Sequence, residues 1–235
     1  MLSKYNTKKK IIFSNEGVTS VFFSYKDLVV KARRVKQLIP EAKIIFVIRN
    51  QFDWFESQYR DHPFDPRDFT IGKSVSFDKW VNIVGWSQSI KLKGALDYFS
   101  VVSCYEELFG RENLKVLLFE DLSVDLAFFV KEISDFMGIE ESEAQSLLQG
   151  AHENRGVTRW YNIYRQLTRN NHFSFLSKGL KFFVPKEGRR TKAKYYLSDQ
   201  NKNRLDKWYG KGNQKLMKEY GLNLSKYNYP GINRA

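Results

Sequence analysis

The chain has 235 residues, 42% of them hydrophobic, and this length suits one domain with a sizeable core better than two. No stretch approaches the roughly 18 to 20 consecutive apolar residues of a membrane-spanning helix, and no export signal is visible, so we expect a cytoplasmic protein without a transmembrane segment. The single cysteine, Cys104, excludes an internal disulfide and a cysteine-based zinc site. We expect it to be a buried thiol, and we expect no bound metal.

The net charge of +13 is distributed unevenly along the chain. Residues 1–150 contain 20 Lys and Arg against 21 Asp and Glu, whereas residues 151–235 contain 19 against 5, a net of +14. Such a basic block attracts nucleic acid, an acidic membrane surface, an anionic polysaccharide or a phosphorylated cofactor. Because the basic residues form no recognised nucleic-acid-binding module, we expect no nucleic-acid partner. Peripheral contact with a membrane stays open.

The first half of the chain alternates predicted strands with predicted helices. Residues 11–14 indicate a short buried strand, and apolar residues at helical spacing predict a helix over residues 24–40. Residues 43–48 (KIIFVI) form a β-branched apolar run that is typical of a central parallel strand. The polar, aromatic stretch at residues 51–60 is expected to be helical.

The pattern continues beyond a predicted loop at residues 63–76. A helical region then runs to a C-cap at Gly110, and a second central strand is expected at residues 114–119. Apolar residues on one face predict a helix over Leu126–Met137 that ends at Gly138. Strands that alternate with helices indicate an α/β fold around a parallel sheet.

The last third of the chain differs from this core. After residue 150 the strands run out, and the chain becomes helical, basic and aromatic. A loop is expected at residues 185–194, followed by a helix from about Asp199 that Gly210 and Gly212 interrupt. We therefore expect a single domain over residues 1–235, with an α/β core at residues 11–150 and a basic helical part at residues 151–235.

Arg49 and Ser57 are the strongest candidates for chemistry. Ligands of open α/β sheets gather at the carboxyl ends of the parallel strands, where helix N-termini favour phosphate, and Arg49 directly follows a predicted strand. Ser57, eight residues later, faces roughly the same way from the next helix. A guanidinium and a hydroxyl so placed can grip one phosphate. Alternatively, Arg49 pairs with an acidic neighbour and Ser57 is a cap or is solvated.

Four segments stand out in order along the chain. They are SNEG (residues 14–17), AKIIFVIRNQFDWFESQY (42–59), ENLKVLLFEDLSVDLAFFVKEISDFMGI (112–139) and NQKLMKEYGLNLSKYNYP (213–230). Together they resemble PAPS-dependent sulfotransferases of the bacterial and carbohydrate type. In that family a strand ends in Arg, Ser follows eight positions later, and the pair binds the 3′-phosphate of PAPS (3′-phosphoadenylyl sulfate).

The resemblance implies this role for Arg49 and Ser57. It also implies a P-loop-NTPase-like three-layer fold with a short parallel sheet, a helical C-terminal third, PAPS as sulfuryl donor and PAP as product.

Two loops of that family compare differently with this sequence. The basic run KEGRRTKAK (residues 186–194) resembles the loop that closes over the 3′-phosphate, with Gly188, Arg189 and Arg190 as its candidate residues. A solvated charge run is the alternative. The family's Gly-containing 5′-phosphosulfate loop belongs before residue 14, but the first strand and this loop are not recognisable there. Either the sequence is a truncated version of a longer enzyme, which we favour, or the protein lacks half of its cofactor site.

The acceptor hydroxyl needs a general base. Glu16, at a predicted strand end, is the first candidate, and His62, just beyond the helix that carries Ser57, is the second. A loop carboxylate and a surface histidine are the alternatives. The resemblance implies transfer of a sulfuryl group from PAPS to a hydroxyl of a carbohydrate-like acceptor. The competing hypothesis is a catalytically impaired module, derived from such an enzyme, that binds PAP or an anionic glycan.

Overall fold

A computed structural model of the chain describes residues 12–13, 25–61, 75–87, 94, 96–148 and 194–232. Two strands, β1 (Ile44–Ile48) and β2 (Leu114–Leu118), lie at its centre and pair in parallel along their whole length. The prediction of two parallel strands is thus confirmed. Ile12 and Phe13, which were expected to lie in a strand, do not form one and are exposed. Strand-favouring side chains are not sufficient, because a strand also needs a hydrogen-bonded neighbour.

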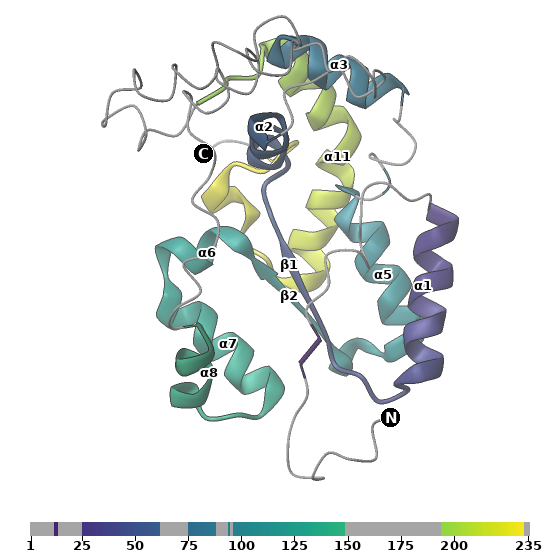
Figure 1. Cartoon of the computed structure of the whole chain (residues 1–235), viewed down its shortest axis with the longest axis vertical. Coiled ribbons are helices and arrows are strands. Elements are labelled where there is room, and N and C mark those ends of the chain that lie inside the picture. The colour runs from purple at the N-terminus through teal and green to yellow at the C-terminus, as the bar shows by residue number, and fades with distance from the viewer. Residues whose placement is uncertain are drawn as a thin grey trace, which may run out of the picture.

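Helices lie on both sides of the two strands (Figure 1). Most of these helices agree with the sequence pattern, whereas the helices at Phe119–Val124 and Glu141–Leu148 were not predicted. The described helices are α1 (Tyr25–Leu38), α2 (Gln51–Asp61), α3 (Phe77–Ser87), α5 (Tyr98–Phe109), α6 (Phe119–Val124), α7 (Leu126–Met137), α8 (Glu141–Leu148) and α11 (Asp199–Tyr220), with 3-10 helices η3 (Arg111–Asn113) and η6 (Leu224–Tyr227).

The alternation of side chains along the strands decides which helices cover each face. Phe46 and Val116 point into a core that they share with α1, α5 and α11. Lys115 points to the opposite face, where its ammonium group pairs with Glu132 of α7. The described strands therefore lie between two layers of helices, which is compatible with the expected three-layer fold.

A second core holds α2 at the carboxyl ends of the strands. Phe55 of α2, Trp80 of α3 and Leu205 of α11 are buried together in it. The rings of Phe55 and Trp80 meet edge to face, with their centroids 6.3 Å apart. Because these contacts come from three helices, the direction in which α2 leaves the sheet is set by tertiary packing.

The last described α-helix, α11, contradicts the expected interruption at two glycines. It runs unbroken over 22 residues, through Gly210 and Gly212. A Cβ atom on Gly210 would lie 2.9 Å from the Cα of Gly231, and one on Gly212 would lie 2.7 Å from the Asp97 carboxylate. The two glycines cost the helix roughly 1 kcal/mol each relative to alanine, but they allow neighbouring segments to approach its backbone.

Cys104 is a buried thiol on α5, as predicted, and burial raises its pKa. Among the helices of the described ranges, none is long and apolar enough to cross a membrane.

Candidate functional site

The candidate site begins where the two strands end. Ile48 and Leu118 are paired, so the residues that follow them, Arg49 and Phe119, emerge side by side at the carboxyl edge of the sheet. The guanidinium carbon of Arg49 lies 5.0 Å from the centroid of the Phe119 ring. The ring is 40% exposed, so this edge presents both a cation and an aromatic surface to solvent.

The backbone of Arg49 is fixed by a hydrogen bond, whereas its guanidinium group is available to a ligand. Its carbonyl oxygen accepts a hydrogen bond of 2.9 Å from the Tyr98 hydroxyl of α5. Burial raises the pKa of Tyr98, so this hydroxyl stays protonated and donates. Among the described carboxylates, none forms an ion pair with the Arg49 guanidinium. Within this part of the chain, the alternative of an Arg paired with an acidic neighbour is not seen.

Asn50 turns the chain from β1 into α2. Its side-chain oxygen accepts a hydrogen bond of 2.9 Å from the Phe52 N–H and so caps the first turn of α2. Its amide group donates to the carbonyl of Tyr227 at 2.6 Å, and its backbone N–H donates to Glu120 Oε1 at 2.7 Å. The N-terminus of α2 is therefore fixed at the edge that carries Arg49, which is the geometry that favours an anion.

The two acidic residues after β2 are structural braces. Glu120 accepts one hydrogen bond from Asn50 and another, of 2.9 Å, from the Tyr229 hydroxyl. Asp121 Oδ1 accepts from the Tyr227 hydroxyl at 2.5 Å and from the Lys226 ammonium at 3.2 Å. Both carboxylates thus tie the segment after α11 to the edge of the sheet.

Ser57 lies nearly two turns into α2. Within the described ranges, no hydrogen-bond partner is found for its hydroxyl, and the side chain is half-buried. Asp53 lies one turn before it. Partial desolvation of the Asp53 carboxyl raises its pKa, and the nearby positive charge of Arg49 opposes that increase. The guanidinium therefore acts electrostatically on the face of α2 that leads to Ser57.

The described end of the basic segment contacts the same helix. The backbone N–H of Tyr195 donates to Glu56 Oε1 at 3.2 Å, and Glu56 precedes Ser57. The Tyr195 ring also meets the Tyr59 ring edge to face, with centroids 4.7 Å apart. These contacts anchor the chain directly after residues 186–194 on α2.

The predicted site residues divide into two groups. Arg49 lies in the turn after β1 and Ser57 lies on α2, the turn and helix that were expected to carry them. Glu16, His62, Gly188, Arg189 and Arg190 lie outside the described residues.

The sequence interpretation missed Phe119, Asn50 and Glu120. A signal was available for Phe119, because it follows the second strand as Arg49 follows the first. The pairing of Asn50 with Glu120 crosses 70 residues and had no local signal.

Comparison with protein-family models matches residues 28–221 of the chain to the sulfotransferase domain family. The match includes both strands, Arg49, Ser57 and the whole of α11. No curated protein and no solved structure matches the chain.

Proposed function

The chain belongs to the sulfotransferase domain family, and from that premise we propose that it moves a sulfuryl group from PAPS to a hydroxyl of a carbohydrate-like acceptor. One observation carries the choice of donor. Arg49, just before α2, has no ion-pair partner among the described residues, and Ser57, nearly two turns into α2, has no hydrogen-bond partner among them. Two unused donor groups at the carboxyl edge of a parallel sheet suit a phosphate ligand.

In this proposal Arg49 and Ser57 bind the 3′-phosphate. The planar guanidinium offers two parallel N–H donors to phosphate oxygens, and the Ser57 hydroxyl adds a third donor from the helix. The exposed Phe119 ring beside Arg49 provides a surface on which the adenine base stacks. Phosphate and base of one nucleotide are thus recognised by residues that follow two adjacent strands.

The basic loop adds a second set of donors to the same phosphate. Tyr195 is anchored on α2 beside Ser57, and Arg190 precedes it by only five residues. An extended chain of five residues spans at most about 17 Å, and one of six residues about 20 Å. We therefore propose that Arg190 and Arg189 reach the phosphate that Ser57 contacts. Gly188 allows the backbone of this loop to come close to the ligand.

Sulfuryl transfer resembles phosphoryl transfer in its dependence on positioning and charge. The acceptor oxygen attacks the sulfur and forms a new S–O bond, while the bond from sulfur to the bridging phosphate oxygen breaks and PAP leaves with that electron pair. A base takes the proton of the acceptor hydroxyl. We assign this role first to Glu16 and second to His62.

Calorimetric titration with two nucleotides tests the proposal. We expect wild-type protein to bind PAP, Arg49→Ala to weaken PAP binding by about 30-fold or more, and Ser57→Ala by about 5-fold, because hydrogen bonds to a charged group are lost. AMP lacks the 3′-phosphate, so its affinity should barely change in either variant.

Arg33→Ala, at an exposed arginine of α1, is the matched control and should bind PAP like wild type. Radiolabelled sulfate transfer from PAPS to mixed neutral polysaccharides then tests the reaction itself. Absence of PAP binding in wild type, or binding that is indifferent to Arg49→Ala, would disprove the clamp.

A further inference from the structure

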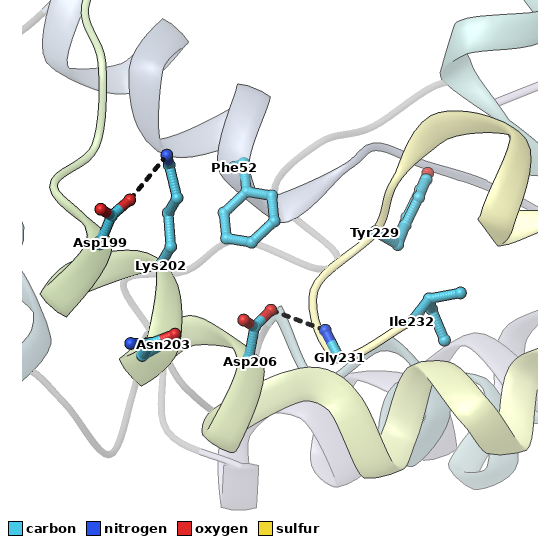
Figure 2. Close-up of a pocket in the computed structure, with 8 residues that line it drawn as sticks. All are labelled: Phe52, Asp199, Lys202, Asn203, Asp206, Tyr229, Gly231 and Ile232. Carbon is cyan, nitrogen blue, oxygen red and sulfur yellow. Dashed lines mark hydrogen bonds and ion pairs between the residues drawn. The ribbon is translucent and has the colours of Figure 1, made fainter. Parts of the chain in front are cut away.

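A pocket of about 430 Å³ lies between the first turn of α2, the first turns of α11 and the segment after η6 (Figure 2). This volume falls within the range of small-molecule sites. Phe52 borders the pocket from α2, the buried Tyr229 and Gly231 border it from the C-terminal segment, and α11 supplies most of the polar groups. Phe52 is three residues from Arg49, so the pocket adjoins the proposed nucleotide site without including its Arg or Ser.

The wall formed by the C-terminal segment is fixed to α11. The N–H of Gly231 donates to Asp206 Oδ1 at 2.7 Å, and the carbonyl of Pro230 accepts from Asn213 Nδ2 at 2.9 Å. The backbone of Gly231 also packs directly on that of Gly210. The pocket is therefore formed before any ligand arrives, which lowers the entropic cost of binding.

The charges of the lining disfavour an anionic ligand. The Lys202 ammonium is 3.1 Å from the Asp199 carboxylate, and this pair is close to neutral. The Asp206 carboxylate adds a further negative charge. Its Oδ1 accepts from the Gly231 N–H, and its other oxygen has no partner among the described residues. A phosphate or sulfate group would meet an excess carboxylate here, in contrast to the cationic edge at Arg49.

The remaining chemistry of the lining suits a neutral molecule with many hydroxyls. Asp206 accepts hydrogen bonds, Lys202 donates them, and the Asn203 amide does both. Phe52, which is only partly buried, adds an aromatic ring against which the apolar face of a sugar ring can pack. An amine ligand would suit Asp206 but would face the Lys202 ammonium, so the mixed donor and acceptor set favours a neutral ligand.

We propose that this pocket binds a neutral saccharide unit of the acceptor, with Asp206 and Asn203 hydrogen-bonded to its hydroxyls and Phe52 packed against its ring. This inference rests on the proposed function, because it supplies the acceptor site next to the nucleotide site.

The test is calorimetric titration of the full chain with neutral lactose, maltotriose and chitotriose, with anionic hyaluronan tetrasaccharide and with cationic chitosan trisaccharide. At least one neutral sugar should bind wild-type protein. Asn203→Ala and Asp206→Asn should each weaken that binding by about 10-fold, as expected when hydrogen bonds to a ligand are removed. The amide oxygen that Asp206→Asn introduces can still accept from the Gly231 N–H, and Asn203 is exposed, so both variants should fold.

The control variant is Asp135→Asn, at an exposed carboxylate of α7, which should leave sugar binding unchanged. Titration with PAP separates the two proposals, because PAP should bind all of these variants equally. Three results would overturn the acceptor assignment while leaving the nucleotide clamp intact. Wild-type protein could bind PAP but no neutral sugar, it could bind only the charged sugars, or both variants could bind a neutral sugar as tightly as wild type.

Discussion

The guanidinium of Arg49 lies over the ring of Phe119, although 70 residues separate the two along the chain. The contact exists because both residues directly follow paired strand ends in a parallel sheet. It joins the cation that we propose to bind the 3′-phosphate to an exposed aromatic surface at one edge, and the proposed nucleotide recognition depends on this arrangement.

Phe119→Ala should weaken PAP binding by about 10-fold, because stacking of a base on an aromatic side chain contributes roughly 1–3 kcal/mol. Phe119→Tyr keeps the ring and should bind PAP like wild type. Phe128→Ala removes a different exposed ring, on α7, and is the control for effects of losing any surface aromatic side chain. Fluorescence or calorimetric titration measures all three, and equal loss of affinity in the Ala and Tyr variants would argue against stacking.

Glu120→Ala should lower the free energy of unfolding by roughly 2–4 kcal/mol, because it leaves the Asn50 N–H and the Tyr229 hydroxyl without their acceptor. Urea denaturation followed by circular dichroism measures this change. Glu107→Ala, at an exposed carboxylate of α5, should change stability by less than about 0.5 kcal/mol. Similar losses in the two variants would mean that Glu120 is not a brace.

Gly231→Ala and Gly221→Ala form a matched pair. Both glycines have a positive φ, +69° and +67°, but a Cβ on Gly231 would overlap the backbone of Gly210, whereas one on Gly221 meets nothing within 4 Å. Gly221→Ala should cost about 1 kcal/mol of stability from backbone strain alone. Gly231→Ala should cost at least roughly 2 kcal/mol more and should also disturb the pocket next to Asp206. Equal costs would show that the close approach to α11 is not needed.

Tyr105 provides a prediction about pH. Burial raises its pKa from 10.0 to about 12, so the fold favours the protonated phenol. This contribution to stability is complete below pH 10 and is lost as the pH rises from 10 to about 12, at roughly 1.4 kcal/mol per pH unit. Tyr105→Phe should therefore reduce the alkaline loss of stability, measured by urea denaturation between pH 9 and pH 11.

The same variant has a second expected effect at neutral pH. Among the described residues, no hydrogen-bond partner is found for the buried Tyr105 hydroxyl. Its removal should leave the stability at pH 7 unchanged or raise it by up to about 1 kcal/mol. The exposed Tyr196→Phe is the control and should change neither measurement. A clear loss of stability at pH 7 in Tyr105→Phe would contradict the unsatisfied hydroxyl.

The sequence alone predicted the elements whose signals are local. Strand β1 follows from a β-branched apolar run, and α7 follows from one apolar face that ends at Gly138, where φ is +63°. The spacing of Arg49 and Ser57 is also local, since a strand end and the following helix separate them. Sequence reasoning could therefore identify both residues as a pair before their surroundings were known.

Tertiary structure decided the features that have no local signal in the sequence. From the sequence, the two glycines of α11 predicted an interruption of the helix. Packing of Gly210 against Gly231 offsets their low helix propensity, and the helix continues. Likewise, Arg49 could have paired with an acidic neighbour. Strand register instead places it beside Phe119, while Asn50 and Tyr229 engage the nearby Glu120. The sequence thus determined which residues form the proposed phosphate-binding pair, and long-range pairing determined that their donors remain available, because hydrogen-bond partners are allocated only when distant segments meet.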